Sequence, residues 1–313
     1  MFSGWIQEFD SKIRQRPEAR VLVYFALILA LAAIPYVIVV DKERWLHIDP
    51  AAYDSVLEGI FASAAVAAVF LMRSTPGAMP IESYGFRLQG IVTQTAIGAA
   101  VGLALMSAIM NVLRVTGHYV ISGVNHSFSP VQPLILFLFV AIAEETIFRG
   151  FIFTTLEAKW GTFIAITTTS LLFGLSHLVD PVPGVSFESH LRSAIFIGVE
   201  AGILLNAAFI LTRSLWLGIG IHWAWNFFEG PFYGTSVSGM DESAPLYHAH
   251  TEGDPLITGG AFGPEGGIVC LIICTLAGLY MLRLGIRAGN WRRNPEIELD
   301  LPPDTKNREE AVR

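Results

Sequence analysis

The sequence predicts an all-α membrane protein, a polytopic bundle of about eight transmembrane helices. Hydrophobic residues make up 53% of its 313 residues and charged residues only 15%, whereas a soluble domain carries about 25% charged residues. The positions of the charged residues are a second observation: they gather at the termini and in short segments between long apolar runs. This distribution predicts a lipid bilayer as surroundings and excludes nucleic acid as an expected partner.

A helix needs about 20 mostly apolar residues to cross the hydrocarbon core of a bilayer. The candidate spans are residues 21–40, 56–72, 91–113, 131–153, 162–178, 193–211, 215–228 and 268–284. The run 215–228 is short and contains His222 and Asn226. Polar residues in membrane helices usually face the bundle interior or a wet cavity, so this run is kept as a span and becomes a candidate part of a site.

The two ends of the chain differ in composition from the predicted membrane domain, 21–289. Residues 1–20 carry acidic and basic side chains before any apolar run and do not fit a cleavable signal peptide. Their apolar residues recur at helical spacing, which predicts an amphipathic segment at the membrane interface. Residues 290–313 are polar and contain several prolines, which predicts a disordered cytoplasmic tail.

The placement of lysine and arginine predicts the orientation, because short basic loops stay on the cytoplasmic side. With eight spans and both termini in the cytoplasm, few of the 20 basic residues lie on the outer side. They are Lys42, Arg44, Arg114 and Arg192, while Arg149 lies within a span. The asymmetry favours an even number of spans, and it places the long Gly- and Pro-rich segment 229–267 outside.

The fourth span places two carboxylates and a guanidinium inside an apolar helix, at Glu144, Glu145 and Arg149. An uncompensated charge there costs about 2.5–3.5 kcal/mol on insertion scales. Glu145 and Arg149 are four residues apart with the acid first, which is the favoured helical pairing. We therefore expect them to neutralise one another, and Glu144 is left as a carboxylate able to take up and release a proton.

His177, in the fifth span, is predicted to lie at the depth of Glu144. The two spans meet at a turn near Trp160 and Gly161, about 16 residues after Glu144 and about 16 before His177. At 1.5 Å per residue, both side chains lie about 24 Å from the turn. Antiparallel neighbours would thus bring the carboxylate and the imidazole together.

The seventh span contributes His222 and Asn226, which share one helix face at four-residue spacing. A neutral imidazole and a side-chain amide can both donate hydrogen bonds to an oxygen that gains negative charge. With Glu144 and His177, the set contains a base, a second group to orient water, and two such donors. This combination points to hydrolysis of an amide bond inside a membrane.

These residues form three ordered patterns: EExxxR from Glu144 to Arg149, FxxxH from Phe173 to His177, and HxxxN from His222 to Asn226. Their order in successive apolar helices resembles that of the CPBP intramembrane proteases, which include the prenyl-protein (CAAX) endopeptidases and many bacterial relatives. The resemblance begins at 84–87 and continues through the seventh span, so the protease core is expected at about 84–230. It implies an endopeptidase of a bacterial inner membrane that cuts a membrane-associated or lipidated peptide or protein.

The resemblance also implies a role for each matching residue. The catalytic ones would be Glu144 and His177, which activate the attacking water, and His222 and Asn226, which stabilise the oxyanion. The supporting ones would be Glu145, Arg149 and Phe173.

Whether a metal takes part is a separate question, because the family is often labelled metalloprotease. Glu144, His177 and His222 could ligate zinc with a fourth position open for water. The sequence lacks the HExxH pattern that places two ligands one helical turn apart, and Glu144 can serve as a general base without a metal. We therefore expect no cofactor, with zinc on these three residues as the alternative.

Two other functions stay open. A transporter or proton-coupled carrier also uses buried acids and histidines, although the internal repeats typical of transporters are not evident here. A non-catalytic scaffold of the same fold is the other. In the sixth span, Glu200 and Asn206 are either part of the cavity lining or satisfied polar contacts, and we favour the second interpretation; Gly198 with Gly202 predicts a close contact between helices.

Overall fold

The computed structural model describes residues 16–46, 50–75, 78–179, 182, 185–241 and 244–293, without the side chains of 41–51. Within these residues the fold is an all-α bundle, as predicted, with one small two-stranded sheet. Most of the predicted amphipathic segment, at 1–15, and most of the predicted tail, at 294–313, lie outside the described residues.

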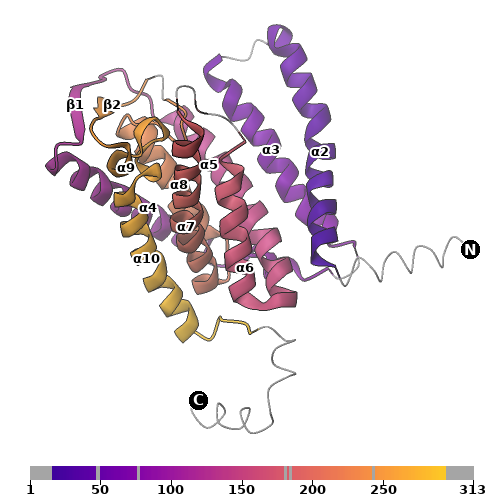
Figure 1. Cartoon of the computed structure of the whole chain (residues 1–313). Helices are drawn as coiled ribbons and strands as arrows, with labels where there is room; N and C mark the ends of the chain where they lie inside the picture. Colours follow the sequence, from indigo (N-terminus) through magenta and orange to yellow (C-terminus); the bar gives the residue numbers. More distant parts are fainter. Residues whose placement is uncertain are drawn as a thin grey trace, which may run out of the picture.

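Eight α-helices build the bundle (Figure 1). They are α2 (Pro17–Leu46), α3 (Pro50–Met72), α4 (Ile91–Val115), α5 (Val131–Glu145), α6 (Thr154–Ser176), α7 (Phe187–Thr212), α8 (Trp216–Phe227) and α10 (Ile268–Arg287). Two π-helical segments continue α5 and α8, namely η2 (Thr146–Phe153) and η3 (Phe228–Phe232). The short helices are η1 (Ile81–Tyr84), α9 (Pro255–Thr258), η4 (Gly260–Phe262) and η5 (Pro264–Gly266).

Six helical segments of the described chain are long and apolar enough to cross a membrane. They are Pro17–Val40, Ala52–Met72, Ile91–Val115, Val131–Ser176, Phe187–Thr212 and Ile268–Arg287. The predicted count of about eight is therefore not confirmed by length and composition. Two features cause the difference: Val131–Ser176 counts as one segment of 46 residues, and α8 has only 12 residues, fewer than the roughly 20 that a span needs.

The chain turns back on itself within the 46-residue segment, at Gly161. Its φ of 79° and ψ of 171° are not helical, and a positive φ is readily adopted only by glycine. Phe148 precedes this residue and Phe173 follows it, yet their ring centroids are 5.0 Å apart. The two halves are therefore antiparallel neighbours, which confirms the predicted turn near Trp160 and Gly161.

The helices that carry the predicted site residues pack in the middle of the bundle. Helix α7 lies against α6, α8 and α10. Of its apolar 18-residue stretch, 67% is buried, a larger share than in any of the other candidate spans of the described chain. Helices α2 and α3 lie side by side at one edge of the bundle (Figure 1), where α3 also packs against α5. The centre is thus the place where polar side chains are best shielded from lipid.

Small residues allow the central helices to approach closely, as expected in membranes. A Cβ atom on Gly202 would lie 2.4 Å from the Ser170 hydroxyl, and one on Gly198 would lie 3.0 Å from the Ser170 carbonyl oxygen. The predicted close contact at these two glycines is thus confirmed, between α7 and α6. Helix α8 meets α4 in the same way, since a Cβ atom on Gly220 would lie 2.2 Å from the Thr95 carbonyl oxygen.

An antiparallel sheet of two strands covers one end of the bundle, and the sequence did not predict it. Strand β1 (Tyr119–Val124) follows α4, and β2 (Tyr247–Thr251) belongs to the segment 229–267. The Tyr119 hydroxyl donates to the Tyr233 carbonyl oxygen at 2.6 Å. Burial, together with the neighbouring tyrosines, raises the pKa of Tyr119, so this hydroxyl keeps its proton and holds the sheet to the segment.

Candidate active site

A cavity of about 350 Å³ lies between the central helices and contains the four residues predicted to be catalytic. Glu144 comes from α5, His177 from the end of α6, and His222 with Asn226 from α8. Phe173, one turn before His177, also lines the cavity. The structure therefore brings these side chains together from three helices.

Glu144 reaches the cavity from the last turn of α5. Its side chain is 30% exposed, and its Oε2 atom lies 3.7 Å from Nε2 of His222. In the described part of the chain, no hydrogen bond joins Glu144 directly to His177. Both side chains line the same space, so a small molecule between them can contact both.

His177 is held in one orientation by the turn of helix before it. Its Nδ1 atom lies 2.8 Å from the carbonyl oxygen of Phe173. A carbonyl oxygen can only accept a hydrogen bond, so Nδ1 carries the proton and the neutral ring has its lone pair on Nε2. The carbonyl oxygen of His177 accepts a hydrogen bond from Nε2 of His190 at 2.7 Å, which fixes the end of α6.

His222 lies between two carboxylates. Its Nδ1 atom is 3.1 Å from Oε1 of Glu145, and its Nε2 atom faces Glu144. The contact with Glu145 was not predicted, because the sequence paired Glu145 with Arg149 only. On the same face of α8, the Asn226 side chain has no hydrogen-bond partner among the described residues, so its amide is free to donate into the cavity.

The predicted ion pair between Glu145 and Arg149 is present. Arg149 donates from Nη1 to Oε1 of Glu145 at 2.8 Å, and the two side chains are 0% and 1% exposed, respectively. Arg149 also donates from Nη2 to the carbonyl oxygen of Ala201 at 3.3 Å, and its guanidinium carbon lies 4.5 Å from the ring centroid of Phe173. One guanidinium thus connects η2 to α6 and α7, directly behind the cavity wall.

The helix that carries this pair is π-helical from Thr146 to Phe153. Such segments hydrogen-bond from i to i+5 and are frequent at functional sites. The sequence predicted an uninterrupted α-helix here, and no composition signal marks the change. Because η2 begins directly after Glu145, the change in helical pitch starts at the site itself.

Sequence reasoning missed further acidic residues of the cavity. Glu58 on α3 and Glu265 in the segment 229–267 both line it. Glu200 on α7 lines it as well, so its interpretation as a satisfied polar contact was wrong: Oε1 accepts from Sγ of Cys270 at 3.0 Å, while Oε2 has no partner among the described residues. The same interpretation was right for Asn206, which donates to Oγ1 of Thr169 at 3.0 Å.

The segment 229–267 forms part of the cavity wall. Val237, Ser238 and Met240 line the cavity. The carboxylate of Glu265 accepts hydrogen bonds from the Ser238 backbone N–H at 2.7 Å and from its hydroxyl at 2.6 Å. The segment 229–267, for which the sequence indicated no chemical role, thus closes one side of the site.

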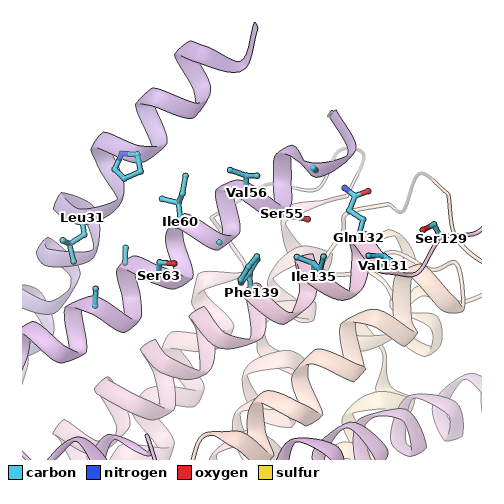
Figure 2. A pocket seen from close by; sticks show the side chains of 15 residues that line it. Leu31, Ser55, Val56, Ile60, Ser63, Ser129, Val131, Gln132, Ile135 and Phe139 are labelled. Carbon is cyan, nitrogen blue, oxygen red and sulfur yellow. The ribbon is translucent and has the colours of Figure 1, made fainter. Parts of the chain in front are cut away.

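A second, larger hollow is a groove of about 880 Å³ between α2, α3 and α5. Figure 2 shows Leu31 on α2, Ile60 on α3 and Phe139 on α5 around it. The described residues that line it carry no ionisable side chain. General acid–base chemistry needs such side chains, so the smaller cavity is the candidate active site.

The arrangement of the cavity residues bears on whether they could hold a metal ion. Within the described chain, no three His, Cys, Asp or Glu side chains are placed so that they could hold a metal ion. The Phe173 carbonyl oxygen and Glu145 occupy the Nδ1 atoms of His177 and His222, so only their Nε2 atoms are left as possible ligands, as is usual for histidines that bind a metal. As placed here, Glu144, His177 and His222 do not come together into a group that would hold an ion.

The comparison with known protein families supports the resemblance in the motifs. Residues 125–228 match the family described as type II CAAX prenyl endopeptidase Rce1-like. The match includes all four predicted catalytic residues and lies inside the expected protease core. No curated protein and no solved structure matches the chain. Over residues 125–228 the chain therefore resembles the Rce1-like CAAX endopeptidases, which supports a protease, a hydrolase, in a chain whose described part has six helical segments long and apolar enough to cross a membrane.

Proposed function

We propose that the protein is an intramembrane endopeptidase that hydrolyses a peptide bond in a membrane-associated or lipidated peptide or protein. The observation that supports this most strongly is that Glu144, His177, His222 and Asn226 line one cavity among apolar helices. A carboxylate and a histidine face two potential hydrogen-bond donors across that space. Amide hydrolysis requires this division of roles.

In the proposed mechanism Glu144 is the general base. A water molecule held between its carboxylate and the Nε2 lone pair of His177 loses a proton to Glu144 as its oxygen bonds to the substrate carbonyl carbon. When the tetrahedral intermediate collapses, the carbon–nitrogen bond breaks and Glu144 returns the proton to the leaving amine. The hydrogen bond from Nδ1 of His177 to Phe173 supports this role, since it leaves Nε2 free to accept.

His222 and Asn226 stabilise the oxyanion in this proposal. Glu145 is paired with Arg149 and accepts from Nδ1 of His222, so Nε2 can donate only when the ring is an imidazolium. The carboxylates on both sides of the ring favour that cation. The oxyanion would then meet a charged donor, in place of the neutral histidine expected from the sequence, and charged donors form the stronger hydrogen bonds.

The proposed mechanism uses no metal. We expect hydrolysis to continue at the parental rate after exhaustive chelation, with zinc measured in the same sample at well below one ion per chain. A sample treated with zinc-saturated chelator is the control for effects of the chelator itself. Loss of activity that returns on adding zinc, with one ion bound per chain, would contradict the mechanism and favour zinc on Glu144, His177 and His222.

We further propose that the protein lies in a bacterial inner membrane with both termini in the cytoplasm. The placement of the basic residues supports this orientation. A single cysteine added near either terminus, in a chain without Cys270 and Cys274, should react with an impermeant thiol reagent only after the membrane is opened. Labelling of intact cells would contradict it.

The function is tested by identifying the products of cleavage in cells. Cells that carry the parent protein and cells that carry Glu144→Gln are compared by mass spectrometry of new peptide termini. We expect termini in membrane-associated proteins that depend on Glu144. Identical sets of termini in the two strains, at equal levels of the two proteins, would overturn the proposal.

A further inference from the structure

The candidate active-site cavity carries a surplus of acidic side chains. The described residues that line it include four carboxylates and neither lysine nor arginine; the acids are Glu58, Glu144, Glu200 and Glu265. Arg149 is fully buried behind the wall and is paired with Glu145, so its charge is already balanced. Among the described residues that line the cavity, the side chains able to carry a positive charge beside Glu144 are the histidines His177 and His222.

Three of the four acids have partners within the protein. Glu144 lies beside His222, Glu265 accepts two hydrogen bonds from Ser238, and Glu200 accepts one from Cys270. Glu58 has no hydrogen bond or ion pair in the described part of the chain. An unpaired carboxylate in an apolar helix is costly and in general marks a functional position.

A second, independent observation is the unused oxygen of Glu200. Its side chain is 2% exposed, it lines the cavity, and its Oε2 atom has no hydrogen-bond partner among the described residues. This oxygen adds to the acidic character of the α7 wall, but the atom itself is buried from solvent. The acceptor that the cavity offers to an entering side chain is therefore the carboxylate of Glu58 on α3.

We propose that Glu58 determines specificity by binding a lysine or arginine side chain of the substrate beside the scissile bond. This inference rests on the proposed endopeptidase function and names the substrate class of the same site. Guanidinium and ammonium groups donate several hydrogen bonds and accept none, so either group is a suitable partner for the unpaired carboxylate of Glu58. A free carboxylate at the same place would be repelled by the same acids.

The test uses the full chain in proteoliposomes and matched peptides. Each peptide carries arginine, its neutral isostere citrulline, or glutamate at one position flanking the scissile bond of a cleaved sequence. We expect kcat/KM for the arginine peptide to exceed that for the citrulline peptide by about 10- to 100-fold, the range of a charge-assisted hydrogen bond. The difference should lie mainly in KM, because the contact is made before the reaction begins.

Variants assign the preference to one residue. Glu58→Gln should bring the ratio between arginine and citrulline peptides close to one, and Glu58→Lys should favour the glutamate peptide. Asp54→Asn is the matched control, because Asp54 lies one turn earlier on α3, is exposed and is outside the cavity lining. It should keep the parental ratio.

The outcomes separate this inference from the proposed function. If the parent cleaves arginine and citrulline peptides equally, the inference is overturned while the endopeptidase function stands. If no peptide is cleaved in a way that depends on Glu144, the function fails and the inference fails with it. Binding of the same peptides to the Glu144→Gln protein gives a readout without chemistry, and equal dissociation constants there would also overturn the inference.

Discussion

Replacing Glu144 by glutamine should lower kcat by about 100- to 10,000-fold, the usual contribution of a general base. The amide has nearly the size of the carboxylate but cannot take the proton from the attacking water. Glu144 is 30% exposed, and among the described residues its carboxylate pairs only with His222, at 3.7 Å, so the fold should tolerate the change. The measurement is kcat and KM on a peptide substrate, with the thermal unfolding temperature of each protein measured in parallel.

The matched control is Glu188→Gln, the same chemical change at an exposed position in the first turn of α7. It should keep parental activity and stability. An activity of the Glu144→Gln protein within about tenfold of the parent would remove Glu144 from the role of base. Loss of activity with an equal loss of stability would also fail to support that role, since it would indicate a structural effect.

The pairing of Glu144 with His177 in one cavity was predictable because it follows from helix geometry alone. Equal distance along two antiparallel helices gives equal depth, and Gly161, where the chain turns, is a residue that sequence reasoning can identify. The ion pair of Glu145 with Arg149 was predictable for the same reason, since four-residue spacing is a local property of a helix.

Contacts between helices could not be predicted from the sequence. The hydrogen bond from His222 to Glu145 depends on how α8 lies against α5, and it is permitted by Gly218, where a Cβ atom would lie 2.9 Å from Oε2 of Glu145. Glu58 joins the cavity only through the packing of α3 on α5. The strands β1 and β2 pair across more than a hundred residues, and although the short run of β2 alternates, no local pattern predicts a partner so far away in the sequence.

Replacing Arg149 by methionine should lower the free energy of unfolding by about 3–5 kcal/mol, because removal of one partner of a buried ion pair leaves the other charge unpaired. Methionine fills much of the space of the arginine stem but cannot donate. The change would remove the bond to Glu145, the bond to the Ala201 carbonyl oxygen and the contact with the Phe173 ring. The measurement is unfolding in detergent or lipid, with activity assayed well below the unfolding temperature.

Glu157 is another buried carboxylate that pairs with arginine, and it offers a matched control. Arg292 lies 3.7 Å from Glu157 and its side chain is 55% exposed, so solvent screens the pair and Arg292→Gln should cost only about 0–1 kcal/mol. The double variant Glu145→Gln with Arg149→Met should be less destabilised than the sum of the single variants, because neither charge is then left alone. Parental stability in Arg149→Met would show that the pair does not hold the helices together. A loss of activity without a loss of stability would instead assign Arg149 to the charge balance around His222, and would make Glu145 a positioning residue for the oxyanion site.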